Sequence, residues 1–314
     1  MKVLFLNHKV KNCGVYQYGE RLFNILKNTP DIEYVYKEVD SFEEYSTLIN
    51  TLDLSAIIYN FHHVTMSWLK QHNIQRIVKN IGIPHESSED FFDIICDIDP
   101  DSTEIKNRFS LPRPIFENVD SMLENYKAST PSIKQFIEYA PIGVPTFGSF
   151  GFGFLNKGFD KIVTLINEQY DEAIIKFVIP CAHFDPNSQN TPLIMRQKCM
   201  LLNKKPNIRV FITHEFFTTE DVLLFLRSNT INLFMYDEMH GRGISSTIDY
   251  AMSVRKPIGI SNSYMFRNVY SDNVCLYKTS VESCIATSVN YFDKYLKKYS
   301  HFNMIDKFRQ IIMK

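Results

Sequence analysis

Strand-like apolar runs alternate with helix-period segments along most of this 314-residue chain, and this alternation constrains the fold more than any other feature. The first such run, at 3–6, is followed by a segment in which Val15, Tyr18, Leu22 and Leu26 form one apolar stripe at helical spacing. Further strand-like runs in the first half lie at 56–61, 76–78 and 92–96. Alternation of this kind predicts parallel sheets covered by helices, which is an α/β fold.

The same pattern repeats in the second half of the chain. Strands are predicted at 148–151, 174–179, 208–212, 231–235 and 257–260, with helices from Gly158, over 220–227 and from Ser245. Pro141, Gly143 and Pro145 interrupt regular structure between the halves. Because the chain exceeds one typical domain of roughly 100 to 200 residues, we expect two domains, 1–143 and 144–314. The last helix, 302–314, could pack back on the first domain.

The composition argues against nucleic acid as a partner, against disulfide bonds and against a membrane-spanning segment. Lys and Arg total 34 against 35 for Asp and Glu, so the chain has no overall positive field to attract nucleic acid. The six cysteines include no CxxC pair, which favours reduced thiols and a cytoplasmic location. No apolar run approaches the ~20 residues that span a bilayer. Membrane contact would therefore be peripheral, for example through the basic segment 297–314.

The strongest local motif is Gly-Arg-Gly-Ile-Ser-Ser at 241–246, directly after the predicted strand 231–235. It opens a predicted amphipathic helix in which Ser245 or Ser246 is the expected cap, with Asp249 completing a capping box. Free N–H groups, the helix dipole and the charge of Arg242 would then favour a bound diphosphate. The alternative is a well-capped helix whose glycines serve only the turn.

Three polar motifs follow predicted strands in the first half. Gly14 lies in the first strand-to-helix turn, His62 and His63 follow the strand 56–61, and His85-Glu86 follows Gly82-Ile83-Pro84. Open α/β sheets bind ligands at the carboxyl ends of their strands. We therefore expect His85, which titrates near neutrality when unperturbed, to donate hydrogen bonds or move a proton at this edge, with Glu86 orienting it or meeting an acceptor. Simple turn chemistry and ordinary surface histidines are the alternatives.

Two other classes of site are disfavoured. The first strand is not followed by GxGxxG, which counts against a nicotinamide-binding domain. No element carries HxxxH or a similar ligand spacing, and Asp97-Ile98-Asp99 ends a strand before Pro100. We therefore expect no metal site and interpret Asp97 and Asp99 as structural.

The segment 232–261 resembles the donor site of retaining GT-B glycosyltransferases of the large family-four type. A strand, an acidic residue, a Gly-rich helix start, Ala251-Met252 and the run KPIGIS at 256–261 carry this resemblance. It implies two Rossmann-like domains facing a central cleft, with a nucleotide diphosphate sugar bound by the second. The implied donor-binding residues are Gly14, Lys157, His214, Arg242, Gly243, Ile244, Ser245, Ser246, Asp249 and Arg267.

The resemblance also implies roles for individual positions. His85 would contact the transferred sugar, with Glu86 and His62 beside it, and Asp249 stands near the glutamate that binds the ribose in the family. The sequence departs from the family where His240, Asp237 or Glu238 replaces a glutamate, and where Gly151 or Phe152 replaces an arginine. Arg242 or Arg267 would compensate for that missing cation.

The implied activity is transfer of a sugar to a glycan or other hydroxyl acceptor, with retention at the anomeric carbon. It would need neither metal nor cofactor, and UDP or GDP is the expected nucleotide of the donor. A nucleotide-sugar epimerase, a phosphorylase on the same fold and a non-catalytic sugar-nucleotide-binding module stay open as alternatives. The sequence does not fix the oligomeric state.

Overall fold

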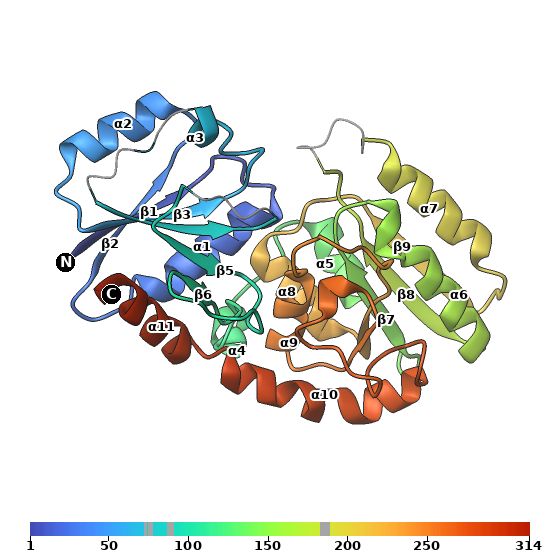
Figure 1. Cartoon of the computed structure of the whole chain (residues 1–314). Coiled ribbons are helices and arrows are strands. Elements are labelled where there is room, and N and C mark those ends of the chain that lie inside the picture. The colour runs from blue at the N-terminus through green and yellow to red at the C-terminus, as the bar shows by residue number, and fades with distance from the viewer. Residues whose placement is uncertain (72–73, 75–77, 87–90, 183–188) are drawn as a thin grey trace. The chain divides into compact units, whose positions relative to one another are not determined.

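The computed structural model describes residues 1–314 except 72–73, 75–77, 87–90 and 183–188. The chain divides into two compact units, each built around one parallel sheet (Figure 1). Unit 1 comprises Met1–Ile115, Gly241–Ile244 and Lys298–Lys314. Unit 2 comprises Phe116–His240 and Ser245–Lys297. Each unit is described by itself.

The sheet of unit 1 has the strand order β2-β1-β3-β4-β5-β6. Its strands are β1 (Lys2–Asn7), β2 (Glu33–Glu38), β3 (Ala56–Phe61), β4 (Lys79–Pro84), β5 (Ile94–Asp97) and β6 (Arg108–Ser110). Val3 and Phe5 pack in one hydrophobic cluster and Leu4 and Leu6 in another, because successive side chains of a strand face opposite sides. Helices α1 (Gly14–Leu26) and α11 (His301–Met313) cover the first face; α2 (Phe42–Thr51) and α3 (Trp68–Gln71) cover the second.

The sheet of unit 2 has the order β11-β10-β7-β8-β9. Its strands are β7 (Thr146–Phe150), β8 (Ala173–Val178), β9 (Ile208–Thr213), β10 (Ile231–Phe234) and β11 (Ile258–Ile260). One face packs on α6 (Phe159–Gln169), α7 (Thr191–Leu202) and α10 (Val281–Lys298), whose side chains share a core with the strands. Among its described residues, the other helical elements are α4 (Val119–Leu123), α5 (Pro131–Glu138), η1 (Leu155–Lys157), α8 (Thr219–Ser228), α9 (Thr247–Ser253) and η3 (Tyr264–Phe266).

Each sheet has one point at which the strand order reverses direction. In unit 1 the chain passes from β1 to β2 on one side and then to β3 on the other, so the reversal lies between β1 and β3. In unit 2 the chain runs from β7 to β8 and β9, and β10 then pairs with the opposite side of β7. Ligands of open α/β sheets bind outside the carboxyl ends of strands at such reversals. These two points therefore locate the candidate site residues of each unit.

The α/β prediction is confirmed, and most predicted strands lie within two residues of observed ones. The strand predicted at 76–78 falls largely outside the described residues, and the strand observed nearby is Lys79–Pro84. The first segment of unit 1 ends at Ile115, whereas the predicted boundary lay at 143. Helix α5 instead belongs to unit 2, where it packs on α8 with Phe136 against Phe225. Helix α11 belongs to unit 1, where it packs against α1 (Figure 1).

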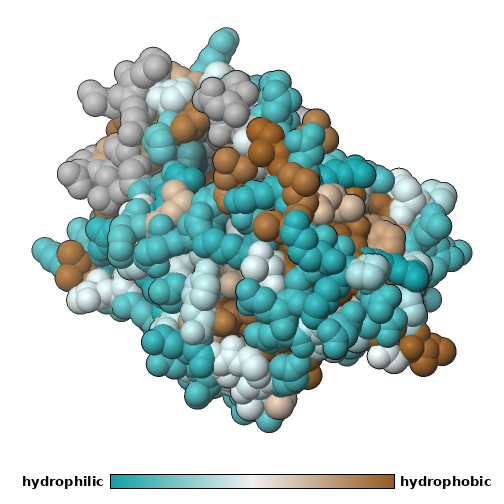
Figure 2. Space-filling view, turned by 90° about the vertical axis from the view of Figure 1, so that its right-hand side faces the viewer, coloured by the Kyte–Doolittle hydropathy of each residue, from teal (hydrophilic) through white to brown (hydrophobic). Residues whose placement is uncertain are grey.

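Among the described residues, no helix combines the length and the apolar character needed to cross a membrane. The face shown in Figure 2 is largely hydrophilic, with apolar residues in small groups.

Candidate functional site

Two buried asparagines organise the strand reversal of unit 1. Asn7 ends β1 and Asn60 lies near the end of β3, and neither side chain is exposed. The Asn60 side-chain amide donates to Asn7 Oδ1 at 2.9 Å and to the Val15 carbonyl at 2.7 Å. The Asn7 amide in turn donates to the Tyr16 carbonyl at 3.0 Å. This network fixes the first turn of α1 against two strand ends.

His85, at the end of β4, is held by the same network. Its Nε2 lies 2.7 Å from Asn60 Oδ1. Because the Asn60 amide nitrogen already donates twice, Oδ1 is the accepting atom and His85 Nε2 carries the hydrogen. Burial lowers the pKa of His85 well below its usual value, assisted by the charges of His62, Arg113 and His8. His85 is therefore neutral at pH 7 with Nδ1 as an acceptor, which corrects the expectation of a proton shuttle with a near-neutral pKa.

Glu86 does not orient His85 as predicted. Its Oε2 lies 3.5 Å from His62 Nε2, and its Oε1 lies 3.0 Å from Arg242 Nη1 within unit 1. The hydrogen bond from His62, and then the nearby charge of Arg242, hold the pKa of Glu86 below its usual range. Orientation of His85 comes from Asn60 instead, because that amide lies on the neighbouring strand.

His8 was not predicted, yet it lies next to His62 at the β1 side of the reversal. The Val10 N–H donates to His8 Nδ1 at 3.1 Å, so the neutral ring carries its hydrogen on Nε2. This Nε2 is buried and has no hydrogen-bond partner among the described residues, and the whole side chain is 1% exposed. Burial and the charge of His62 lower the pKa of His8 to about 4. An unsatisfied buried donor at a strand end is available for a ligand.

Gly14 begins α1 beside this network. No atom lies within 4 Å of the position that a Cβ would take, so the backbone is approachable there. Because α1 has no acidic residue in its first turn, its N-terminus keeps a positive electrostatic end.

Lys157 marks the strand reversal of unit 2. It ends η1 after β7, and its Nζ lies 3.9 Å from the ring centroid of Tyr236, which follows β10. Gly158 lies between η1 and α6 with φ +66°, and its backbone packs closely against the segment after β10. A Cβ on Gly158 would lie 1.8 Å from the Met235 carbonyl oxygen. Lys157, which the family resemblance implies as a donor-binding residue, therefore follows β7, one of the two strands at the reversal of this sheet.

The helix predicted from Ser245 begins later and is short. Helix α9 spans Thr247–Ser253, and the side chain of its N-cap residue, Ser246, makes no capping hydrogen bond, so the predicted capping box is wrong. The Ser245 N–H already donates to the Met265 carbonyl at 3.0 Å. Asp249 is only 1% exposed. The Ser245 backbone is thus bound within unit 2, because Met265 in η3 supplies the acceptor.

The glycine-rich part of the motif, Gly241–Ile244, belongs to unit 1. A Cβ on Gly243 would lie 2.6 Å from the His85 carbonyl oxygen, so a side chain there would displace backbone. Ile244 is buried, whereas the Arg242 side chain is partly exposed beside Glu86. The structure thus brings Arg242 and Gly243 together with Glu86 and His85.

Two further predicted residues of unit 2 follow a strand and a short helical turn, respectively. His214 follows β9, and its Nδ1 lies 2.9 Å from the Ile179 carbonyl, which fixes Nδ1 as the donor. Its Nε2 is buried without a partner among the described residues. Arg267 follows η3, stacks on Tyr264 at 4.1 Å from the ring centroid, and donates to the Tyr264 carbonyl at 2.9 Å. Arg267 is thus held close to its own turn.

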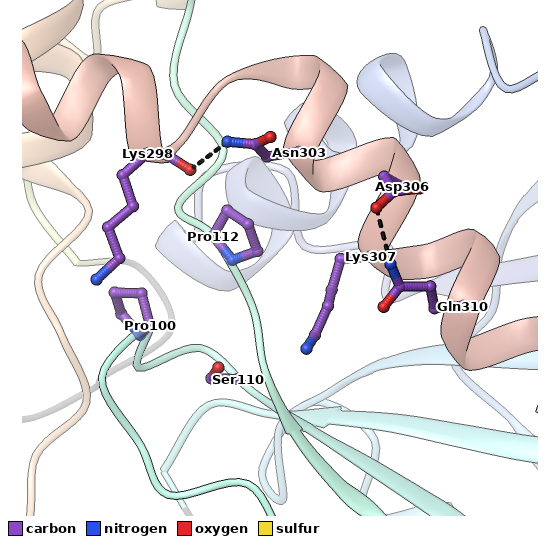
Figure 3. Close-up of a pocket in the computed structure, with 8 residues that line it drawn as sticks. All are labelled: Pro100, Ser110, Pro112, Lys298, Asn303, Asp306, Lys307 and Gln310. Carbon is purple, nitrogen blue, oxygen red and sulfur yellow. Dashed lines mark hydrogen bonds between the residues drawn. The ribbon is translucent and has the colours of Figure 1, made fainter.

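A polar pocket of about 260 Å³ lies in unit 1 beside α11 (Figure 3). Lys298 pairs with Asp101 at 2.5 Å and Lys307 pairs with Glu104. Figure 3 shows the Asp306–Gln310 hydrogen bond along α11 and the bond from Asn303 to the Lys298 carbonyl. Because both ammonium groups already have carboxylate partners, this pocket offers little charge for an anion.

Comparison with known proteins defines the class of fold. No protein-family model and no curated protein match the sequence. The two units with parallel sheets match solved structures of the GT-B glycosyltransferase fold over almost the whole chain. At these low identities the likeness shows the fold alone.

Three solved structures illustrate the match. A glycosyltransferase from Rickettsia africae is 12% identical with a TM-score of 0.65, covering 99% of this chain and 97% of that chain. Anabaena HepE, solved in complex with UDP-glucose, is 8% identical with a TM-score of 0.64, covering 100% and 99%. A UDP-forming α,α-trehalose-phosphate synthase from Burkholderia xenovorans is 8% identical with a TM-score of 0.64, covering 100% and 98%.

Proposed function

We propose that this protein is a glycosyltransferase that moves a sugar from a nucleotide diphosphate sugar to an acceptor hydroxyl. The observation that carries the proposal is the full-length likeness to proteins solved as glycosyltransferases, one of them with UDP-glucose bound. Further support comes from the polar side chains at both strand reversals. UDP is the first donor nucleotide to test, and GDP the second. Transfer with retention and without a metal or cofactor belongs to the same proposal.

In the proposed reaction, the donor phosphates bind at the strand reversal of unit 2. Breaking the glycosidic bond places negative charge on the leaving diphosphate, and a fixed cation stabilises that charge most where water is excluded. Lys157 is the principal candidate, because Tyr236 and the turn at Gly158 hold it in place. Arg267 and His214 are the other donor-side candidates. Ser245 takes part through its side chain, since its N–H is already bonded.

The acceptor and the transferred sugar are assigned to groups of unit 1. His85 Nδ1 is oriented as a hydrogen-bond acceptor for a sugar hydroxyl, and His8 Nε2 is a donor without a partner among the described residues. Glu86 is ionised at neutral pH because His62 and Arg242 hold its pKa below the usual range. The approachable backbone of Gly14 completes this group.

A second candidate function is sugar-nucleotide binding without transfer. The specific observation in its favour is the short α9, whose preceding segment has one N–H already committed to the Met265 carbonyl. Fewer free N–H groups would stabilise a leaving diphosphate less. Binding of a donor without turnover would distinguish this function from transfer.

The test begins with a thermal-shift screen against UDP-, GDP-, ADP- and CMP-sugars, since a ligand that binds the folded state raises its stability. Release of free nucleotide is then measured with the donor that gives a shift, with and without candidate acceptors. Lys157→Met should weaken donor binding by roughly tenfold, whereas Lys204→Met, which removes an exposed lysine on the α7 side, should not. Absence of a thermal shift with every donor would overturn the proposal.

A further inference from the structure

His62, His63 and Glu86 bring three potential metal ligands together at the ends of two neighbouring strands. One ligand atom from each residue lies within 4.8 Å of the other two. We propose that these residues form a binding site for a divalent transition-metal ion of the zinc class. Glu86 is also one of the groups assigned to the acceptor and the transferred sugar, but the metal site does not rest on the proposed transfer reaction, which needs no metal.

The backbone explains how consecutive histidines reach one ion. In a continuing strand, His62 and His63 would point to opposite faces. The chain instead turns directly after β3, and the two imidazole rings stack at a centroid distance of 4.6 Å and an interplanar angle of 27°. Glu86 arrives from the neighbouring strand, because β3 and β4 pair in parallel with Phe61 opposite Pro84. Three ligands thus converge at one edge of the sheet.

The hydrogen-bonding state of the cluster leaves ligand atoms available. His63 Nδ1 is buried and has no hydrogen-bond partner among the described residues. Glu86 Oε2 faces His62 Nε2 at a long 3.5 Å. The Val64 N–H donates to His62 Nδ1 at 3.3 Å, so a metal on Nε2 would move the ring hydrogen to Nδ1 and break that bond. Coordination therefore replaces two long contacts, the one from the Val64 N–H to His62 Nδ1 and the one between His62 Nε2 and Glu86 Oε2.

Ligand chemistry selects the class of ion. Two imidazoles and one carboxylate suit Zn²⁺ or Co²⁺, whereas Mg²⁺ and Ca²⁺ prefer oxygen ligands throughout. Three protein ligands would leave further positions of the ion to water.

Arg242 gives the site a second testable property. Its Nη1 lies 3.0 Å from Glu86 Oε1, so the guanidinium and a metal ion would share one carboxylate. The positive charges of the guanidinium and of a metal ion on the same carboxylate repel each other. Removing the charge with Arg242→Gln should therefore tighten metal binding, whereas loss of a ligand should weaken it.

The experiment is calorimetric titration of the whole metal-free chain with Zn²⁺, and separately with Mg²⁺, in the absence of substrates. The expected result is saturable Zn²⁺ binding at one site and none for Mg²⁺. His63→Asn and Glu86→Gln should each weaken Zn²⁺ binding by roughly tenfold or more, and Arg242→Gln should strengthen it. Thermal unfolding without metal verifies that each variant is folded.

The matched control is an exposed pair of the same kind. His240 Nε2 lies 3.5 Å from Glu238 Oε1, the distance seen between His62 and Glu86, and the His240 side chain is 83% exposed. His240→Asn should leave Zn²⁺ binding unchanged. Lack of saturable Zn²⁺ binding, or equal binding by folded His63→Asn and the unmodified chain, would overturn the site. Because no donor is present, neither result bears on glycosyl transfer.

Discussion

Asn60 Oδ1 accepts a hydrogen bond from His85 Nε2 at 2.7 Å, and this contact leaves Nδ1 as the ring nitrogen that can bind a ligand. The Asn60 amide group cannot reverse, because its nitrogen donates to both Asn7 Oδ1 and the Val15 carbonyl. A buried side chain thereby sets the tautomer of a partly exposed one. Asn60 is a positioning residue in this arrangement.

Replacing Asn60 with alanine should destabilise the protein by about 3 kcal/mol. The change removes the hydrogen bonds of Asn60 with Asn7 Oδ1, the Val15 carbonyl and His85 Nε2 in a buried region. Asn7 Oδ1 still accepts from the His8 N–H, and each buried group left unsatisfied costs roughly 1 to 3 kcal/mol before relaxation. Urea denaturation gives the free energy of unfolding. Asn28→Ala is the control, because Asn28 is exposed at the end of α1, and its effect should stay within about 0.5 kcal/mol. Equal effects of both changes would contradict the assigned role of Asn60.

Buried histidines should make the protein lose stability in mild acid. The pKa of His8 falls from 6.5 to about 4 on folding, so the unfolded chain binds more protons in this window. The stabilising contribution is complete above pH 6.5 and is lost as the pH falls toward 4, by about 2 to 3 kcal/mol at pH 4.5. His85, whose pKa is also lowered, adds a loss of the same sign.

The measurement is the free energy of unfolding from denaturant titrations between pH 7.5 and 4.5. His8→Gln should show a shallower decline than the unmodified protein, and His240→Gln, at an exposed position, should show the same decline. A His8→Gln protein with the original slope would show that His8 does not titrate as inferred.

Most of the strands could be predicted from the sequence because the apolar runs that predict strands are the segments that the fold buries. Runs such as 56–61 are buried at every position, which is the pattern of a central parallel strand and agrees with β3. Strand β2 was missed because it lies at the sheet edge with a mostly half-exposed, Lys- and Glu-containing sequence. Helix α10 was missed because its buried positions are few, including Val281, Cys284 and Phe292 in eighteen residues.

The candidate site was predictable in part, because polar residues after strands mark the carboxyl edge. His62 and His85 were predicted on that basis, whereas Lys157 was implied by the family resemblance. Glu86 pairs with Arg242 through a contact between segments far apart in the chain. His62 and His63 face the same edge because the chain turns directly after β3. No spacing within one element encodes them. His8 was missed because a single histidine after a strand carries no motif.

The contribution of Lys176 to the stability of the protein should increase at alkaline pH. It lies fully buried in β8, donates to the Ile137 carbonyl at 2.8 Å, and burial lowers its pKa from 10.5 to about 8. At Lys176 the unfolded chain binds more protons between pH 8 and 10.5, so the contribution of this residue to stability rises with pH by about 2.5 kcal/mol from pH 7 to 10. The buried thiols of Cys199 and Cys284, whose pKa values are raised, contribute with the opposite sign in the variant and the unmodified protein alike. Lys176→Met should lack this rise, whereas the exposed Lys134→Met should keep it. Parallel pH profiles for Lys176→Met and the unmodified protein would refute the inference.

Alanine substitutions at Gly158 and Gly14 should have different effects, the first on the stability of the protein and the second on its activity. Gly158 has φ +66° and a Cβ there would lie 1.8 Å from the Met235 carbonyl, so Gly158→Ala should destabilise unit 2 by about 2 kcal/mol or more. Gly14 begins α1 with open space around its Cβ position, so Gly14→Ala should preserve stability. If Gly14 allows a ligand to approach the backbone, the alanine methyl group should nevertheless reduce the rate of nucleotide release from the donor. Thermal unfolding and the release assay on both variants test this contrast. A stable Gly14→Ala protein with undiminished nucleotide release would remove Gly14 from the site.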